Sequence, residues 1–413
     1  MKSRRTVLRT VGVAGVVGLA GCGGEDTTEA EETPTDGGGG SDETPTEDGS
    51  GSAETPTDDS GASGNWRATH ADARHSSANT ASNGPTSADS AETLYEPDGL
   101  VDLQSPPLVE DGQKFVLSNK KLFSVSASGE LSWAFGIGGY VSPNDPMPAV
   151  RDGTVYVPVA STLAAVSGGE RDWAASFEHS VEYSPVTTED AVYVSTRSEI
   201  LSYAHDGTEQ WSLSLDHDPG SPAIVGSTLY YFSTDPHQQS ELYARDTSDG
   251  SLRWSEPVDT LSERVVIADG TVYAVKSSRD ATKLVALSGA DGSVEWESPS
   301  ITESVIGPLE VAVAGDSVYL TTMNKLRAYS TEDGSPQWDG PYVGTGTNVF
   351  DPRVDSNSVY LFDGSAAVAV DRSTGDQRWS VPLGDGGALG YKGLSVADDS
   401  VYVTIQDEVL TVA

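Results

Sequence analysis

Seven of the eight tryptophans in the chain recur at a nearly constant interval. Successive members are 40, 38, 43, 42, 42 and 41 residues apart. A period near 40 is typical of β-propeller blades and of helical arrays, in which each repeat buries its apolar face against its neighbours. The members are Trp133, Trp173, Trp211, Trp254, Trp296, Trp338 and Trp379. Most of the chain is therefore built from one repeated unit.

A second repeated feature identifies this unit as a β-sheet. Asp-Gly pairs at Asp249, Asp291 and Asp333 favour tight hairpins between short alternating strands. No long segment has the 3.6-residue period of a helix. Each repeat also contains an apolar run with one aromatic residue, found at Phe115, Tyr156, Tyr193, Tyr230, Tyr273, Tyr319, Tyr360 and Tyr402. These patterns predict four-stranded antiparallel blades.

The chain has eight aromatic runs but only seven repeat tryptophans. The two ends of the chain explain why one tryptophan fewer is found. The last repeat reaches Ala413 without an outer strand, whereas residues 92–97 align with the outer strand of the next repeat and place Tyr95 at a tryptophan position. We expect strand 92–97 to complete the sheet formed by residues 394–413. The sequence thus predicts an all-β fold: an eight-bladed β-propeller over residues 92–413, closed by pairing of an N-terminal strand with the C-terminal blade.

The repeated tryptophans have a structural role in this fold. A large flat side chain with one N–H donor can fill the wedge between neighbouring radial sheets and bond to a backbone carbonyl there. We expect the seven repeat tryptophans, with Tyr95 in the eighth position, to dock each blade onto the next. Ligand stacking is the less favoured interpretation, because every repeat carries one of these residues.

The first 22 residues have the pattern of a targeting segment. Arg4 and Arg5 precede an apolar run over residues 11–20 that is too short to span a bilayer as a helix. This pattern resembles a twin-arginine export signal, and the following LAGC resembles a lipobox, which implies cleavage before Cys22 and lipid on its thiol. A buried apolar Cys22 is the alternative. Because Cys22 is the only cysteine, a disulfide within the chain is excluded.

Residues 23–64 cannot form a core of their own. They contain 13 acidic residues but no Lys, Arg, Val, Ile, Leu or aromatic residue. Such a composition predicts a disordered, self-repelling tether, with an O-glycosylated stalk on its threonines as the alternative. Residues 65–91 follow as an irregular leader before the first strand.

The chain is strongly acidic, with 63 acidic and 24 basic residues and a net charge of -39. This charge disfavours binding to nucleic acid, because the protein would repel phosphate groups. The composition resembles that of proteins from halophiles such as haloarchaea, in which molar salt shortens the screening length to about 3 Å. An acidic surface protein of a mesophile is the alternative.

One repeat carries a recognisable family motif. In Ala369–Trp379, the residues at the positions of the tryptophan-docking motif of quinoprotein propellers are Ala369, Asp371, Thr374, Gly375 and Trp379. The segment that begins at Trp66 and continues to Gly84-Pro85-Thr86 is similar to the leader of such proteins. Over residues 65–413 the chain thus resembles the pyrroloquinoline-quinone-like (PQQ-like) propeller repeat family.

The resemblance implies one of two roles. Such propellers include PQQ-dependent alcohol or sugar dehydrogenases, and non-enzymatic lipoproteins, such as the bacterial outer-membrane assembly factor, that bind other proteins. The larger dehydrogenases resemble one another in a vicinal cysteine pair against the quinone and in Ca²⁺ held by Glu, Asn and Asp. This sequence lacks the cysteine pair, a CxxCH haem site and a recognisable calcium set. We therefore expect no cofactor; PQQ with Ca²⁺ belongs to the dehydrogenase alternative.

We assign no catalytic residue and no metal ligand. The sequence contains no HExxH, no GxSxG and no spaced Cys/His set. His70, Asp72 and His75 form the only local histidine cluster. We expect them to belong to a leader that lies across the propeller, with metal ligation as the alternative.

A ligand site, if present, is expected where the crossings between blades surround the central channel. Arg264, Arg353 and Lys392 are notable there because basic residues are scarce, and each could bind a carboxylate or pair within the molecule. The candidate residues on this face are Asp216, His217, Asp218, Arg264, Asp351, Arg353 and Lys392.

The sequence therefore predicts a monomeric lipoprotein, anchored to the cell membrane and facing outside the cytoplasm, whose propeller is a non-enzymatic scaffold for another envelope protein. The alternatives are a PQQ-dependent oxidoreductase and a solute-binding propeller.

Overall fold

The computed structural model describes residues 64–412 except 69, 100, 143–144, 234–239, 259–263, 278–281, 302–310, 323–324, 343–351 and 385–389. The described residues all lie in one compact unit, Thr55–Ala413. The predicted signal, Cys22 and the predicted tether up to residue 63 lie outside them. No helix in the described part of the chain is long and apolar enough to cross a membrane.

The first four blades follow one another along the chain. Blade 1 contains β2 (Leu108–Glu110), β3 (Gln113–Leu117), β4 (Lys121–Val125) and β5 (Leu131–Gly136). Blade 2 contains β6 (Ala149–Arg151), β7 (Thr154–Val159), β8 (Thr162–Ser167) and β9 (Glu170–Ser176). Blade 3 contains β10 (Val186–Thr187), β11 (Val192–Ser195), β12 (Glu199–Tyr203) and β13 (Glu209–Ser214). Blade 4 contains β14 (Ala223–Val225), β15 (Thr228–Ser233), β16 (Glu241–Asp246) and β17 (Leu252–Pro257).

The other four blades complete the ring. Blade 5 contains β18 (Val266–Ala268), β19 (Thr271–Ser277), β20 (Thr282–Ser288) and β21 (Val294–Glu297). Blade 6 contains β22 (Val311–Ala314), β23 (Ser317–Thr322), β24 (Lys325–Ser330) and β25 (Pro336–Tyr342). Blade 7 contains β26 (Arg353–Val354), β27 (Ser358–Phe362), β28 (Ala366–Asp371) and β29 (Gln377–Pro382). Blade 8 contains β30 (Tyr391–Ala397), β31 (Ser400–Ile405), β32 (Glu408–Val412) and β1 (Ala91–Tyr95).

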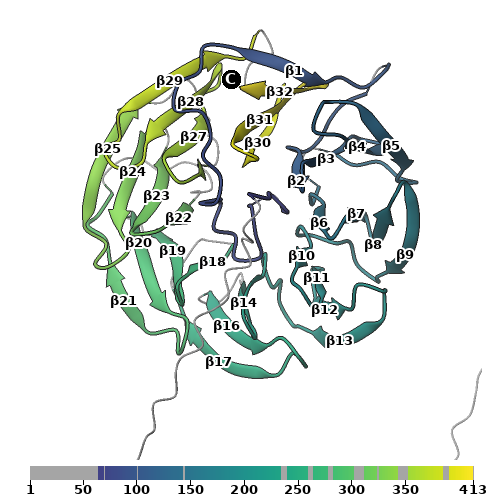
Figure 1. The fold of residues 1–413 in the computed structure, drawn as a ribbon. Helices are drawn as coiled ribbons and strands as arrows, with labels where there is room; N and C mark the ends of the chain where they lie inside the picture. Colours follow the sequence, from purple (N-terminus) through teal and green to yellow (C-terminus); the bar gives the residue numbers. More distant parts are fainter. Residues whose placement is uncertain are drawn as a thin grey trace, which may run out of the picture. The chain divides into compact units, whose positions relative to one another are not determined.

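The eight four-stranded antiparallel sheets fan out around a central axis, which confirms the predicted eight-bladed β-propeller (Figure 1). The inner strand of each blade faces the channel, and β30 of blade 8 lies beside β2 of blade 1. The ring is closed as predicted, because β1 pairs antiparallel with β32 through Ala91 with Val412 and Glu92 with Thr411. The closing strand is Ala91–Tyr95, whereas the sequence placed it at 92–97.

The hydrophobic core lies between neighbouring blades rather than within one sheet. Between blades 1 and 2, for example, Leu108 and Phe115 belong to the same buried cluster as Val150 and Val155. Each strand places alternate side chains on opposite faces of its sheet, so both faces of a blade supply such clusters. A blade can therefore bury its apolar side chains only when both neighbours are present.

The repeat tryptophans dock one blade onto the next. Each acceptor lies in the turn before the outer strand of the following blade, except that the leader supplies the acceptor for Trp379. The bonds from the indole nitrogen are Trp173 to His205 O (2.8 Å), Trp211 to Thr247 O (2.8 Å), Trp296 to Thr331 O (2.8 Å), Trp338 to Arg372 O (2.9 Å) and Trp379 to Pro85 O (2.7 Å). The indole N–H groups of Trp133 and Trp254 have no acceptor among the described residues.

A glycine in each docking turn permits the close approach of the indole ring. Gly375 has a φ of 78°, a conformation that favours glycine, and a Cβ there would lie 2.6 Å from the Trp338 ring. The Asp-Gly and Thr-Gly pairs of the repeat are therefore required by the backbone conformation and by the tryptophan of the preceding blade.

The register corrects the sequence alignment of Tyr95. In blade 6, Tyr319, Ala328 and Trp338 lie side by side on neighbouring strands. The same row in blade 8 is Tyr402, Thr411 and Glu92, so Glu92 occupies the tryptophan position.

Tyr95 pairs with Val409, two residues from the position of Thr411 in this row, so it does not occupy the tryptophan position that sequence alignment assigned to it. Its buried ring instead packs against Phe123 of blade 1, with 5.8 Å between the ring centroids. Tyr95 thus contributes to the junction of blades 8 and 1 by apolar contact.

The hydrogen bond from the indole N–H predicts that two matched tryptophan substitutions lower the free energy of unfolding by different amounts. Trp296→Phe removes the ring nitrogen and leaves Thr331 O without its donor, whereas Trp254→Phe removes an N–H that has no acceptor in the described structure. We expect Trp296→Phe to lower the free energy of unfolding by about 1 kcal/mol more than Trp254→Phe, as measured by denaturant titration. Equal losses would show that the bond does not contribute to stability.

Candidate functional site

Residues 64–68 and 70–79 of the leader, which we call the plug, lie inside the central channel (Figure 1). Trp66, the one tryptophan outside the repeat, is fully buried there. It forms an antiparallel bridge with Val109 of β2, with Trp66 N 2.7 Å from Val109 O and Val109 N 2.8 Å from Trp66 O. The channel that the sequence marked as a ligand site is thus occupied by the chain itself.

The plug bonds to the inner strands of blades 1, 2, 4, 5, 6, 7 and 8. The inner strand of a blade is a sheet edge, and its N–H groups would otherwise face the channel unpaired. Beyond blade 1, bonds run from Val150 N to Arg67 O (2.8 Å), Ile224 N to Ala73 O (2.8 Å), Ile267 N to Arg74 O (3.1 Å), Val313 N to Ser76 O (2.9 Å), Val354 N to Ser77 O (3.0 Å) and Asn79 Nδ2 to Val396 O (2.8 Å). The plug therefore supplies hydrogen-bond partners to the inner strands of seven blades.

A buried carboxylate holds the plug in its irregular shape. Asp72 accepts hydrogen bonds from the backbone N–H groups of Arg74 (3.0 Å) and Ser76 (3.2 Å), and its Oδ2 lies 2.7 Å from Nη2 of Arg74. Ala71 and His75 have φ values of 73° and 56°, which are unfavourable for residues other than glycine. Backbone hydrogen bonds within the plug, from Ala71 N to Ala68 O (3.1 Å) and from His75 N to Asp72 O (3.2 Å), accompany these conformations.

The two histidines of the plug lie next to an arginine. The rings of His70 and His75 meet edge to face at 5.5 Å, and Nη1 of Arg264 lies 2.6 Å from Nε2 of His70. Nδ1 of His75 lies 3.2 Å from Val265 O. Burial, and then the Arg264 charge, lowers the pKa of His75 to about 3, and the same causes hold the pKa of His70 well below its ordinary value. Both rings are uncharged at neutral pH.

Arg353 is also in contact with the plug. Its side chain is buried, Nη1 donates to Ser77 Oγ at 3.1 Å, and Nε donates to Leu394 O at 3.3 Å. The guanidinium carbon lies 5.7 Å from the centroid of the Trp66 ring. Of the three basic residues that the sequence singled out, Arg353 and Arg264 thus both meet the plug.

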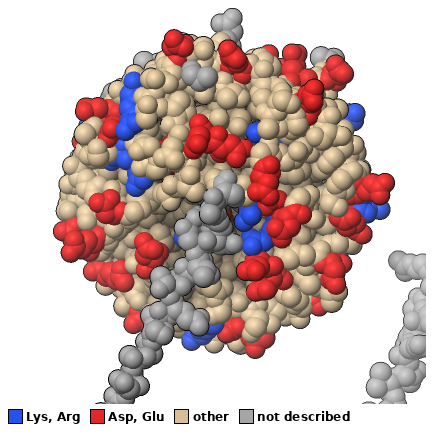
Figure 2. Space-filling view, in the orientation of Figure 1, with Lys and Arg blue, Asp and Glu red and all other residues tan. Residues whose placement is uncertain are grey.

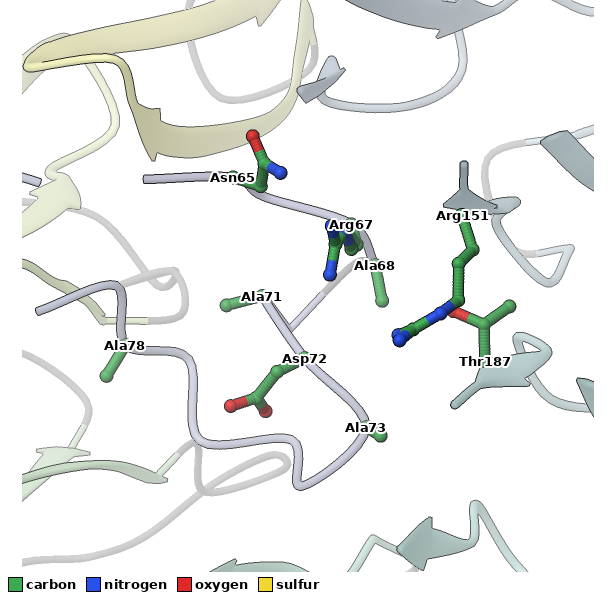
Figure 3. Close-up of a pocket in the computed structure, with 9 residues that line it drawn as sticks. All are labelled: Asn65, Arg67, Ala68, Ala71, Asp72, Ala73, Ala78, Arg151 and Thr187. Atoms are coloured by element: carbon green, nitrogen blue, oxygen red, sulfur yellow. The ribbon is translucent and has the colours of Figure 1, made fainter. Parts of the chain in front are cut away.

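The cavity that remains beside the plug is small. Figure 3 shows Arg151 and Thr187 on the channel wall opposite Asp72 and Ala73 of the plug, around a cavity of about 20 Å³. That volume holds about one water molecule, whereas sites for small-molecule ligands measure roughly 300–1,000 Å³. This cavity is too small to hold a quinone cofactor.

The described residues also lack a cluster of metal-ligating side chains. Among them, no three His, Cys, Asp or Glu side chains converge as metal ligation requires. In the cluster that the sequence identified, Asp72 bonds within the plug and His75 contacts Val265 O, while His70 lies against Arg264. These groups are held by the fold of the plug.

The remaining predicted residues lie apart from this cluster. Nζ of Lys392 lies 3.3 Å from Oδ1 of Asp102, beside an open groove between blades 8 and 1. Asp216 and His217 are exposed in the connection from β13 to β14, and Asp218 Oδ1 accepts from Gly220 N in the same connection. Asp351, like Arg4, Arg5 and Cys22, lies outside the described residues.

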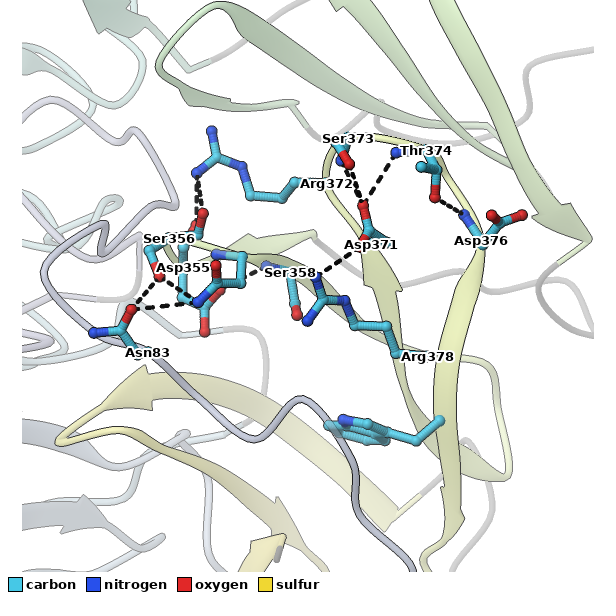
Figure 4. A network of polar contacts seen from close by, with 12 residues as sticks. Asn83, Asp355, Ser356, Ser358, Asp371, Arg372, Ser373, Thr374, Asp376 and Arg378 are labelled. Carbon is cyan, nitrogen blue, oxygen red and sulfur yellow. Dashed lines mark hydrogen bonds and ion pairs between the residues drawn. The ribbon is translucent and has the colours of Figure 1, made fainter.

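After the plug, the leader crosses the turns of blade 7. Asn83 Oδ1 accepts from the Ser356 hydroxyl at 2.6 Å, and Arg372 Nη1 donates to the carbonyl oxygens of Asp355 (2.9 Å) and Ser356 (3.0 Å) (Figure 4). The fully buried Asp355 also accepts from the backbone N–H of Gly84 at 2.6 Å. The leader is thus fixed to the ring before β1 begins.

Sequence reasoning missed the partners of the channel residues. Arg353 and Ser77 are 276 positions apart, and Asp355 and Gly84 are 271 positions apart, so no local pattern links them. One signal was available: Trp66 is the only tryptophan that does not follow the repeat, and the structure places it in the channel.

Comparison with known proteins identifies related sequences and folds. The family model described as outer membrane protein assembly factor BamB matches residues 118–264 and 197–412. The structure of BamB from Moraxella catarrhalis is 16% identical, with a TM-score of 0.59, and the match covers 79% of this chain and 96% of that one.

Two enzymes share the fold. Quinohemoprotein alcohol dehydrogenases from Pseudomonas putida HK5 and Comamonas testosteroni are each 12% identical, with TM-scores of 0.62, covering 84% of this chain and 80% of theirs. No curated protein sequence matches the chain. At these identities the solved structures show the fold alone.

The buried histidine predicts acid sensitivity. In the unfolded chain His75 takes up a proton near pH 6.5, whereas in the folded plug it does so near pH 3. Stability is therefore lost as the pH falls from 6.5 towards 3. We expect His75→Gln to reduce this loss between pH 6.5 and 4.5 in denaturant titrations at fixed salt, whereas His179→Gln, on the exposed surface, leaves it unchanged. Parallel pH profiles of His75→Gln and the original protein would contradict the assignment.

Proposed function

Because the chain belongs to the BamB-like family of PQQ-like β-propeller repeat proteins, we propose that it is a non-enzymatic scaffold that binds another protein of the cell envelope. The observation that carries this proposal is the plug. It fills the position along the channel axis and engages Arg264 and Arg353, the basic residues best placed to bind an anionic ligand there. The outer surfaces of the blades remain for recognition.

The charge of these surfaces favours a basic partner. Figure 2 shows acidic side chains spread over the viewed face and few basic ones. The whole chain carries 63 acidic and 24 basic residues. A field of this sign attracts positively charged surfaces and accelerates their association, and it falls with added salt. The proposed partner therefore presents Lys or Arg.

The N-terminal segments complete the proposal. Arg4 and Arg5 would direct export, Cys22 would carry the lipid that anchors the protein outside the cytoplasm, and residues 23–64 would act as a tether. Residues 65–91 would be the leader and residues 92–413 the propeller. We propose a monomer from a halophilic organism, in which high salt screens the repulsion among the acidic side chains.

Anchoring at Cys22 predicts a change of location on substitution. Without the thiol no lipid can be attached, so we expect Cys22→Ser to move the protein from the membrane fraction to the soluble fraction outside the cytoplasm. Immunoblots of fractionated cells measure this. Ser50→Ala, in the same N-terminal region, is the control and should remain in the membrane fraction. Retention of Cys22→Ser in the membrane would overturn lipid anchoring.

The scaffold function is tested against the enzymatic alternative. Proximity labelling from the anchored protein in living cells should enrich one envelope protein that the purified propeller then binds directly. The purified protein, incubated with PQQ and Ca²⁺ at high salt, should not reduce a redox dye with alcohols or aldoses. Quinone-dependent dye reduction would overturn the scaffold function.

A further inference from the structure

Each repeat tryptophan lies in a docking slot, which we define as the space between its ring and the turn before the outer strand of the following blade. In the slot of Trp133 this turn is shorter than in the others. In blade 2 only Gly168 and Gly169 separate β8 from β9. The equivalent connections in blades 3, 4, 6 and 7 are residues 204–208, 247–251, 331–335 and 372–376, and each supplies the carbonyl that accepts from a tryptophan of the preceding blade. Blade 2 is too short at this point to offer that carbonyl to Trp133.

An open cavity lies beside Trp133. The cavity measures about 300 Å³ and is lined by Trp133, Phe115, Gln113, Ser132 and other residues of blade 1, with Gly153 of blade 2. The indole N–H of Trp133 has no acceptor within the described part of the chain. A volume of this size lies at the lower end of the range for ligand sites.

A second departure from the repeat occurs at the same place. The inner aromatic position is tyrosine in the other blades but Phe115 in blade 1, whose ring lies 6.0 Å from Trp133. In blades 2 and 4 the hydroxyl of this tyrosine meets the docking turn of the following blade, through Tyr156 with His205 Nδ1 (2.7 Å) and Tyr230 with Gly289 O (3.0 Å). Blade 1 thus lacks both this hydroxyl and the turn that it would meet.

Trp254 shows that the absence of a hydrogen bond from the indole N–H is not sufficient to produce a shortened docking turn. Its N–H also has no acceptor among the described residues, but residues 289–293 form a full-length turn. A Cβ on Gly292 would lie 2.7 Å from the Trp254 ring, and a Cβ on Gly169 would lie 3.4 Å from Cγ of Trp133, so a glycine packs close to both rings. The shortened turn, not the missing bond, distinguishes the slot over Trp133.

We infer that the Trp133 slot is the docking site for a tight turn of the partner protein. The inference rests on the proposed scaffold function. The other slots show which chemistry fits: a glycine-containing turn whose backbone carbonyl accepts from the indole N–H. A partner turn would supply in trans what blade 2 omits.

The rim of the slot adds specificity. Gln113 Nε2 donates to Ser124 Oγ (2.7 Å) and Ser132 Oγ (2.9 Å), so its amide oxygen is left to accept from a partner N–H. Both carboxylate oxygens of Glu110 are engaged, by Arg67 Nε and by Gly153 N. Asp111 on the rim is exposed and favours a Lys or Arg beside the incoming turn.

The first test fills the slot from within the chain. In the graft variant, Gly168-Gly169 is replaced by Arg-Ser-Thr-Gly-Asp, the sequence of residues 372–376. The probe is a cyclic peptide that presents Arg-Ser-Thr-Gly, flanked by lysines, to full-length protein containing 5-fluorotryptophan. We expect the peptide to shift the fluorine resonance of Trp133 and not that of Trp254. In the graft variant the resonance should already be shifted and should not respond to the peptide.

Three outcomes of this test overturn the inference. They are a Trp133 resonance that millimolar peptide does not move, an equal shift at Trp254, and a response that persists in the graft variant. A shift produced by a neutral hexose but not by the peptide would reassign the slot to a sugar.

The second test uses the partner found by proximity labelling. A photo-crosslinking amino acid at Ser132, in the slot, should capture that partner, and the same amino acid at Glu295, the matched position in blade 5, should not. The graft variant should bind the partner at least tenfold more weakly at an unchanged or higher melting temperature.

Different results overturn the proposed scaffold function and the proposed docking site at Trp133. A partner that binds the graft variant with unchanged affinity overturns the slot and leaves the scaffold function standing. The absence of any partner overturns both.

Discussion

The inner edge of each blade is the constraint on which the rest of the structure depends. A four-stranded sheet placed radially has one strand at the channel, and its outward-pointing N–H and C=O groups need partners. Here the plug provides some of these partners, through bonds to seven of the eight inner strands. Water in an open channel could also form hydrogen bonds with these groups. The particular effect of the plug is that it occupies the space along the axis, so a ligand cannot bind there.

The same leader also closes the ring, so plug and closure are coupled. After the plug, Gly84 donates to the buried Asp355, Pro85 accepts from Trp379, and Ala91–Tyr95 completes blade 8. Lys114 of blade 1 reaches Asp398 of blade 8 at 3.4 Å, across the same junction. Because one continuous segment makes all these contacts except the last, loss of the plug from the channel would also strain the closing strand. Channel and ring are stabilised together.

The fold could be predicted from the sequence, but much of the site could not. The tryptophan period and the hairpin turns specify eight blades, because each blade is a local structure. Tyr95 was misplaced because the register of β1 on β32 is set by a pairing between the two ends of the chain, and the spacing of the tryptophans does not specify that register. The plug has no periodicity, so Arg264 and Arg353 could be placed near the channel while their contacts with His70 and Ser77 could not be foreseen.

The distribution of charge connects the interior with the proposed binding surface. Arg67, Arg74 and Arg353 lie in or against the plug, and the buried Lys114 lies at the junction of blades 8 and 1. The chain has only 24 basic residues. Because several of them lie at these positions, fewer are present on the outer surface, which is therefore more acidic than it would be if the basic residues were spread evenly. Basic residues are scarce in the sequence, and several of them lie around the leader, where Arg67 and Arg74 pair with Glu110 and Asp72. Fewer basic side chains therefore remain to balance the acidic ones on the outer surface, so the surface field is negative.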